Sequence, residues 1–160
     1  MKRYLLLLVL GTCLGFTSCS KDDDDDNNKP QPTAPEPSAK TQMLTGKKWK
    51  LASLTNNGND FLSNPLFPAC NKDDLYKFNA DSTVTVEEGP MTCSQPGASQ
   101  GTWEFKENET KINLVIPTPT LSLISGDFDV ESLSATTMVL SRTQTAGTST
   151  NKFVATFSAQ

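Results

Sequence analysis

The clearest structural pattern of this chain is in GTWEFKENETKINLVI, residues 101–116. Apolar and polar side chains alternate one by one over residues 101–106 and again over residues 111–114, and Ile116 continues the apolar positions of the second run. Successive side chains of a β-strand point to opposite faces, so this period of 2 predicts strands with one apolar face and one face in water. The polar residues between the two runs are typical of a tight turn, and together the runs predict an antiparallel hairpin.

The same alternation recurs along the rest of the chain from residue 48 to residue 158. The apolar positions of these further runs are Trp49 and Leu51, Tyr76 and Phe78, Val84 and Val86, Phe128 and Val130, Met138 and Leu140, and Phe153, Ala155 and Phe157. With the hairpin above they make eight predicted strands, mostly joined by short polar turns. Eight strands in sequential order can close into an up-and-down barrel, which removes both free edges. We therefore predict an all-β, eight-stranded antiparallel barrel, with a two-sheet sandwich as the alternative.

The first 18 residues have the layout of a secretory signal. Two basic residues precede an apolar run, residues 4–14, that is too short to cross a bilayer as a helix. Small residues follow, and then Cys19, in an order typical of a bacterial lipoprotein signal, in which the cysteine thiol carries a diacylglycerol. Acyl chains on this residue would hold the protein on a membrane. We therefore predict a signal peptide at residues 1–18 and lipidation of Cys19; processing at Cys13 and a secreted, unlipidated product are the alternatives.

An acidic and proline-rich segment, residues 19–40, follows the predicted cleavage site. Its first residues after the cysteine are Ser20, Lys21, Asp22, Asp23 and Asp24. Blocks of like charge stay disordered and spaced prolines extend the chain, so this segment predicts a disordered tether. The short Ser, Lys and acidic tract also resembles the export signal of Bacteroidetes-type surface lipoproteins. That resemblance implies a lipid-anchored protein of the outer membrane that faces the cell surface, with the periplasmic leaflet as the alternative.

The folded domain is expected at residues 41–160, which is long enough for one hydrophobic core. The chain has 14 basic and 18 acidic residues and no evident basic patch, so nucleic acid is not an expected partner. It contains no histidine, the commonest general base and metal ligand. Carboxylate pairs occur at Asp73-Asp74 and Glu87-Glu88, but adjacent residues on a strand point to opposite faces. We therefore expect no enzyme activity, no cofactor and no bound metal.

Two cysteines, Cys70 and Cys93, lie inside the expected domain. Once the two N-terminal cysteines are assigned to the signal and the anchor, these form an even pair in an exported protein, where the compartment is oxidising. We predict a disulfide between them, which would contribute about 3 kcal/mol through closure of the loop. Two free buried thiols are the alternative.

An eight-stranded barrel either fills its interior with side chains or encloses one small ligand. The candidate lining residues are the large apolar positions Trp49, Tyr76, Phe78, Trp103, Phe105, Ile112, Leu114, Met138 and Phe153. Each of them suits a filled core equally well. The long connection from residue 56 to residue 74 adds a candidate lid, which would otherwise be a plug completing the core: Phe61, Leu62, Leu66 and Phe67.

Two functions are consistent with these features. The first is a membrane-anchored barrel that binds a small apolar ligand. The second is a filled barrel that serves as a structural or interaction component of a surface protein complex and takes no small molecule. A packed interior would favour the second, whereas an open interior of roughly 300 Å³ or more would favour the first.

Several short motifs occur in an order that resembles a known family. They are LTGKKWKL at residues 44–51, Cys70, Asp73-Asp74, Tyr76, Phe78, Asp81, Thr83, Cys93 and Gly101-Thr102-Trp103. This order is similar to the bacterial lipocalin-like domain of Bacteroidetes-type lipoproteins, over residues 44–157. One departure is that two residues separate Gly46 from Trp49, where the lipocalin pattern has one. The resemblance implies a small lipocalin-like or calycin-like barrel, commonly of unassigned ligand, and implies no catalytic residues.

Overall fold

The computed structural model describes residues 36–93, 99–117 and 123–160. The folded unit begins at Glu36. No helix within these ranges is long and apolar enough to cross a membrane. The predicted signal peptide, the predicted lipidation site Cys19 and the predicted export tract all lie outside the described residues.

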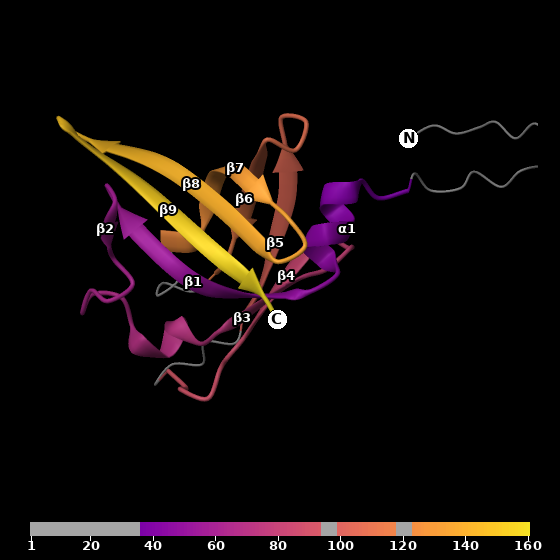
Figure 1. The fold of residues 1–160 in the computed structure, drawn as a ribbon, viewed down its shortest axis with the longest axis horizontal. Helices are drawn as coiled ribbons and strands as arrows, with labels where there is room; N and C mark the ends of the chain where they lie inside the picture. The colour runs from indigo at the N-terminus through magenta and orange to yellow at the C-terminus, as the bar shows by residue number, and fades with distance from the viewer. Residues whose placement is uncertain (1–35, 94–98, 118–122) are drawn as a thin grey trace, which may run out of the picture. The chain divides into compact units, whose positions relative to one another are not determined.

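The described residues form an almost entirely β structure. In chain order the elements are α1 (Ala39–Thr45), β1 (Lys48–Asn56), β2 (Asn59–Asp60), the 3₁₀ helix η1 (Ala69–Lys72), β3 (Leu75–Phe78), β4 (Thr83–Glu87), β5 (Ser99–Lys106), β6 (Lys111–Val115), β7 (Gly126–Leu133), β8 (Thr137–Ala146) and β9 (Ser149–Ala159). These strands make one antiparallel sheet in the order β2-β1-β3-β4-β5-β6-β7-β8-β9 (Figure 1). β9 also pairs with β1, which closes the sheet. Because β2 pairs only with the end of β1, the closed barrel has eight strands, and the predicted up-and-down barrel is confirmed.

The period of 2 decides which side chains face inward, and the strand register brings the inward positions together. In β1 and β4 the buried residues alternate with partly exposed ones. Trp49 lies opposite Tyr76, and Tyr76 lies opposite Val86, so buried positions of neighbouring strands are side by side. An irregularity in the pairing of β1 with β9 between Leu51 and Ser53 shifts the alternation, and Leu54 becomes the next buried residue of β1. The apolar faces therefore meet in one core.

α1 covers one end of the barrel, which we call the helix end. Leu44 of α1 is buried, and the indole N–H of Trp49 donates to the Leu44 carbonyl oxygen at 2.9 Å. The Lys77 ammonium group donates to the carbonyl oxygen of Thr45 at 2.6 Å, which ties the end of the helix to β3. Because α1 begins at Ala39, the last two residues of the expected tether are helical and the folded unit starts before residue 41.

The opposite end, which we call the far end, carries the β1–β2 turn, the connection from β2 to β3 and the β8–β9 turn (Figure 1). Cys70 in η1 and Cys93 after β4 form a disulfide with their Cα atoms 5.3 Å apart, which confirms the predicted bridge. The side-chain oxygen of Asn71, a buried residue of η1, lies 3.1 Å from the Cys93 sulfur. The disulfide therefore joins the β2–β3 connection to the segment that follows β4.

Candidate functional site

Most of the predicted lining residues pack against one another instead of bordering a space. Seven of the nine are at most 6% exposed: Trp49, Tyr76, Phe78, Trp103, Ile112, Leu114 and Met138. The rings of Phe78 and Trp103 lie edge to face with their centres 5.9 Å apart, and those of Tyr76 and Phe157 do so at 5.5 Å. A space wide enough for a ligand would leave accessible surface on its walls. These seven side chains therefore form a dry core.

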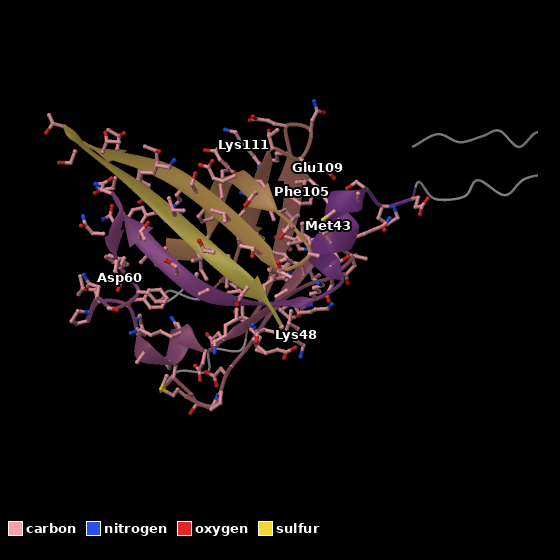
Figure 2. All side chains as sticks on the ribbon, in the orientation of Figure 1. Met43, Lys48, Asp60, Phe105, Glu109 and Lys111 are labelled. Carbon is pink, nitrogen blue, oxygen red and sulfur yellow. A yellow bond between two sulfur atoms is a disulfide. The ribbon has the colours of Figure 1, made fainter. Side chains whose placement is uncertain are left out.

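The other two predicted lining residues, Phe105 and Phe153, are only partly buried and lie at opposite ends of the barrel. Phe105 is near the helix end, at the end of β5, and in the turn that follows, the carbonyl oxygen of Glu109 (Figure 2) accepts from the Lys40 ammonium group of α1 at 2.7 Å. Phe153 lies on β9 opposite Asn56, the last residue of β1, and its ring is edge to face with that of Phe61 at 6.0 Å. Incompletely covered aromatic surface on the inner face is thus present at both ends.

The four predicted lid residues do not form one continuous apolar surface. Phe67 is buried in the core, and Phe61 and Leu62 are partly buried against it. Leu66, by contrast, is 81% exposed. The backbone N–H groups of Phe61 and Leu62 both donate to the carbonyl oxygen of Leu54, at 2.8 and 3.2 Å, so this part of the connection is tied to β1. Three of the four residues thus cover the far end, and the fourth faces water.

A cationic side chain that sequence reasoning missed, Arg142, lies on the inner face at the far end. Met138 and Leu140 of β8 are buried, and Arg142 is the next residue on the same face of the strand. This spacing of two residues is the feature of the sequence that indicates an inward position. The register pairs Arg142 with Phe153 on β9. Its guanidinium carbon lies 5.1 Å from the ring centre of Phe128 and 6.0 Å from that of Phe153. The guanidinium is therefore held between two aromatic rings.

The charge of Arg142 has no acidic partner among the described residues, where the ion pairs all involve lysines. Nη1 donates to the carbonyl oxygen of Ser125 at 2.5 Å, while Nε is buried without a hydrogen-bond partner. Gly126, at φ +119°, leaves space for the group, since a Cβ there would lie 3.2 Å from Nη1. Burial lowers the pKa of Arg142, but an arginine stays charged in proteins. A partly buried cation whose Nε has no hydrogen-bond partner therefore lies at the far end.

An acidic group lies where β3 begins. Asp73 and Asp74 both contact the segment after β4: Asp73 accepts from the Met91 N–H at 2.9 Å, and Asp74 accepts from the Gly89 N–H at 3.4 Å. The expectation that the pair faces opposite ways is wrong, because both residues precede the strand. Asp74 is 1% exposed, and its Oδ2 has no hydrogen-bond partner. Within the described ranges, no set of three or more acidic or cysteine side chains is arranged to hold a metal ion.

Burial is the main cause that raises the pKa of Asp74, and the nearby Asp73 and Glu88 carboxylates raise it further. The folded protein therefore binds this proton more tightly than the unfolded chain does, and ionisation destabilises the fold. The contribution of Asp74 to stability is complete below pH 3.8 and is lost as the pH rises through the folded-state pKa. We expect Asp74→Asn to be more stable than the unchanged protein near neutral pH, with a smaller difference below pH 3.8, as measured by urea unfolding.

Asp127→Asn is the control for this prediction, because its expected change in stability near neutral pH has the opposite sign. Hydrogen bonds from Asn113 and Lys106 lower the pKa of Asp127, so its ionised form stabilises the fold. Near neutral pH this variant is expected to be slightly less stable than the unchanged protein. If Asp74→Asn also lost stability there, the buried carboxylate would be a favourable group and the interpretation would be wrong.

Two hollows bordered by described residues open on the outer side of the sheet. One of about 430 Å³ is lined by Thr83, Gln100, Gly101, Thr102, Val115 and Pro117; we call it the outer groove. Val115 is 51% exposed there. A Cβ at Gly101 would lie 2.0 Å from the carbonyl oxygen of Val115, so the glycine permits β5 and β6 to approach closely. A second hollow, of about 350 Å³, shares Thr102 with the groove and is more polar, with Asp81 and Glu104 on its walls.

The geometry defines a small antiparallel barrel with sequential strands, a dry core and an N-terminal helix across one end. The family model described as a lipocalin-like domain matches residues 44–140 of the chain. That match covers more than half of the chain, from the end of α1 into β8. The protein therefore belongs to the lipocalin-like domain family.

Two solved structures of bovine odorant-binding protein are similar to the chain. The complex with a selenium-containing odorant has 13% sequence identity and a TM-score of 0.44, and covers 81% of this chain and 77% of that one. The complex with the natural ligand has 14% identity and a TM-score of 0.42, and covers 80% and 77%. Similarity this low says nothing about what the present chain binds. The comparison with curated proteins gave no match.

Proposed function

We propose that this protein is a lipid-anchored binding protein that takes a small, mostly apolar ligand at the far end of its barrel and has no catalytic activity. The observation that carries this proposal is the partial burial of Phe61 and Phe153 beside Arg142, in contrast to the dry core. Ligand sites combine apolar walls with a few placed polar groups, and the far end has this combination. Covering the remaining aromatic surface would contribute about 25 cal/mol per Å² of apolar area.

The proposed anchor is the lipid on Cys19, and the proposed address is the outer membrane, facing the cell surface. The N-terminal sequence supports the anchor, and the Ser, Lys and acidic tract at residues 20–24 supports export in the manner of Bacteroidetes-type lipoproteins. The Cys70–Cys93 disulfide is also in keeping with an oxidising compartment.

Mass spectrometry of small molecules that co-purify with the protein tests the binding function. Phe153→Ala and Phe105→Ala form a matched pair, because both remove a partly buried inward ring, one at each end. We expect the unchanged protein and Phe105→Ala to retain the same compound and Phe153→Ala to lose it. A Trp103→Ala variant tests whether retention of the compound depends on the buried core. Equal retention by Phe153→Ala, or no compound in any preparation, would contradict the proposal.

Protease digestion of intact cells tests the proposed address. The protein is expected to be degraded from outside when residues 20–24 are present and to be protected when they are replaced by Ser and Gly. Equal protection in both cases would contradict surface export. A Cys19→Ser chain, expected to leave the membrane fraction, checks the anchor separately.

The outer groove favours a second function, that of a filled barrel acting in a surface protein complex. Its wall at Val115 and Pro117 is apolar and exposed, and it lies on the face away from the core. If this function is correct, a partner protein that cross-links to the unchanged protein should no longer cross-link to Val115→Lys. Thr143→Lys, on the exposed face of β8, should keep the cross-link. Unchanged cross-linking in Val115→Lys would contradict this function.

A further inference from the structure

The hairpin of β8 and β9 continues beyond the strands that flank it (Figure 1). Pairing of β7 with β8 stops at Ser141, and pairing of β1 with β9 stops at Phe153. β8 and β9 stay paired to each other as far as Ala146 and Ser149. The last part of the hairpin, residues 143–151, is therefore a two-stranded ribbon that has no neighbouring strand within the described barrel. The unpaired backbone groups at the edge of a strand can pair with another chain.

The edge of the ribbon that belongs to β9 is covered by Asn57, in the turn after β1. The Asn57 backbone N–H donates to the carbonyl oxygen of Lys152 at 2.8 Å, and its side-chain oxygen accepts from the Lys152 N–H at 2.8 Å. The Asn57 side-chain nitrogen also donates to the carbonyl oxygen of Thr150 at 3.4 Å. Asn57 thus takes up the backbone groups that a further strand would need, and this edge is closed.

The edge that belongs to β8 is open. Thr143 lies opposite Lys152, whose N–H and carbonyl groups both face Asn57 and so point away from β8. The two residues of an opposed antiparallel pair direct their backbone groups either toward each other or both away. Thr143, and Thr145 two positions further on, therefore direct their N–H and carbonyl groups to the free side of β8. No other described residue bonds to these groups. We call this side of Thr143 and Thr145 the open edge.

The ribbon lacks the features that usually prevent pairing between edges. Proteins protect an exposed edge with charged side chains, prolines or bulges. Residues 143–151 read TQTAGTSTN and contain neither a charged residue nor a proline. The pairing of β8 with β9 runs in unbroken register through this part. A second open edge of the same sequence would therefore meet no charge repulsion and no steric block.

The open edge is complementary to itself. If two copies pair antiparallel about a two-fold axis at Gln144, Thr143 of each copy lies opposite Thr145 of the other. Both residues direct their backbone groups to the open edge, so each opposed pair forms the two hydrogen bonds of an antiparallel ladder. Cross-strand pairs of threonines add to the stability of a sheet. The contact uses the same surface on both copies, as a closed two-fold dimer requires.

The barrel wall beside the open edge has room for the turn of a second copy. A hollow of about 200 Å³ is lined there by Arg142, Thr143 and charged residues of β6 and β7. With the two-fold axis at Gln144, Ala146 of the second copy lies opposite Arg142, and the turn at Gly147 comes next to the hollow. Backbone groups of a turn need polar partners, and the charged walls of this hollow supply them.

We propose that the open edge of β8 is an interaction surface for a second copy of this chain, which pairs with it antiparallel about Gln144. The paired segment is short, and specific, stable interfaces bury about 1,200 Å² or more, so a weak and concentration-dependent dimer is expected. This inference goes beyond the ligand-binding function and does not depend on it.

Disulfide trapping tests the inference. Gln144 of one copy would lie opposite Gln144 of the other as a pair without mutual hydrogen bonds, with Cα atoms about 4.5 Å apart, which a disulfide can bridge. The protein is the full chain carrying Cys13→Ser and Cys19→Ser, so that an introduced cysteine is the one thiol outside the Cys70–Cys93 bridge. Under mild oxidation, we expect Gln144→Cys to form a covalent dimer at least about tenfold faster than Thr150→Cys, because pairing raises the effective concentration of the thiols.

Thr150→Cys is the matched control, since it places an exposed thiol on the same ribbon but on the closed edge. Thr145→Pro, added to Gln144→Cys, removes an N–H group from the open edge and leaves the bonds between β8 and β9 intact. It should slow dimer formation about tenfold, the effect of losing one or two hydrogen bonds. Equal rates for Gln144→Cys and Thr150→Cys would overturn the proposal. So would an undiminished rate in Thr145→Pro with native circular dichroism, or a Gln144→Cys thiol that cross-links only to other proteins. If Thr145→Pro failed to fold, the comparison of the two cysteine variants would decide.

Discussion

Trp49→Ala is expected to lower the free energy of unfolding by about 4 kcal/mol, the range of large-to-small changes in a packed core. Trp49 is fully buried at the start of β1, and its indole N–H donates to the Leu44 carbonyl oxygen of α1. The substitution would leave a cavity and would also break the bond that joins the helix to the barrel. Urea unfolding followed by circular dichroism measures the loss.

Two variants separate these contributions. Trp49→Phe keeps an aromatic ring and removes the donor, so a loss of about 1–2 kcal/mol is expected from the unsatisfied carbonyl. Met43→Ala removes a side chain of α1 that is 39% exposed and should change stability by less than about 1 kcal/mol. The account of the core would be wrong if Trp49→Ala were no more destabilising than Met43→Ala.

Loss of the Cys70–Cys93 disulfide has the second largest expected effect. The bridge spans a sequence separation of 23 residues, and in the chain-entropy account a loop of this size stabilises by about 3 kcal/mol. The double variant Cys70→Ala with Cys93→Ala is therefore expected to unfold at a clearly lower urea concentration. The thiol-free variant is preferred to a single substitution because it leaves no unpaired cysteine.

Reduction of the unchanged protein provides the control for this prediction. Dithiothreitol should lower its stability to about that of the double variant and should have no effect on the variant itself. Equal stability of the oxidised protein and the variant would mean that the folded state already restrains η1 and the segment after β4 without the bridge.

The strands were predictable because their signal is local. The alternating runs coincide with strands of the structure, as Val84 and Val86 do with β4, and the short connections correctly indicated sequential order. The disulfide was predictable because only two cysteines remained to pair. α1 and β2 carry weaker local signals: α1 has 7 residues and β2 has 2, so neither offers a long periodic pattern.

The candidate site was less accessible to sequence reasoning. Phe153 was named as a lining residue and Phe61 as a lid residue, but nothing in the chain order indicated that their rings meet. The sequence alone does not establish that Arg142 is directed inward, because charged side chains are mostly exposed. Its place on the inward face of β8 is evident only from the strand register, which sets Arg142 between Phe128 and Phe153.

The alternation of apolar and polar residues within one strand determines which face of that strand is apolar. The sequence of a single strand is therefore enough to identify its apolar face. Whether eight such faces enclose a space or fill it depends on how their side chains interlock once β9 has paired with β1. Here buried side chains, among them the bulky Trp49, Tyr76 and Trp103, fill that space, and the partly buried Phe105 and Phe153 lie toward its ends. The dry core and the unpaired cation at the far end therefore belong to the closed barrel, because they arise from contacts between residues far apart in the chain.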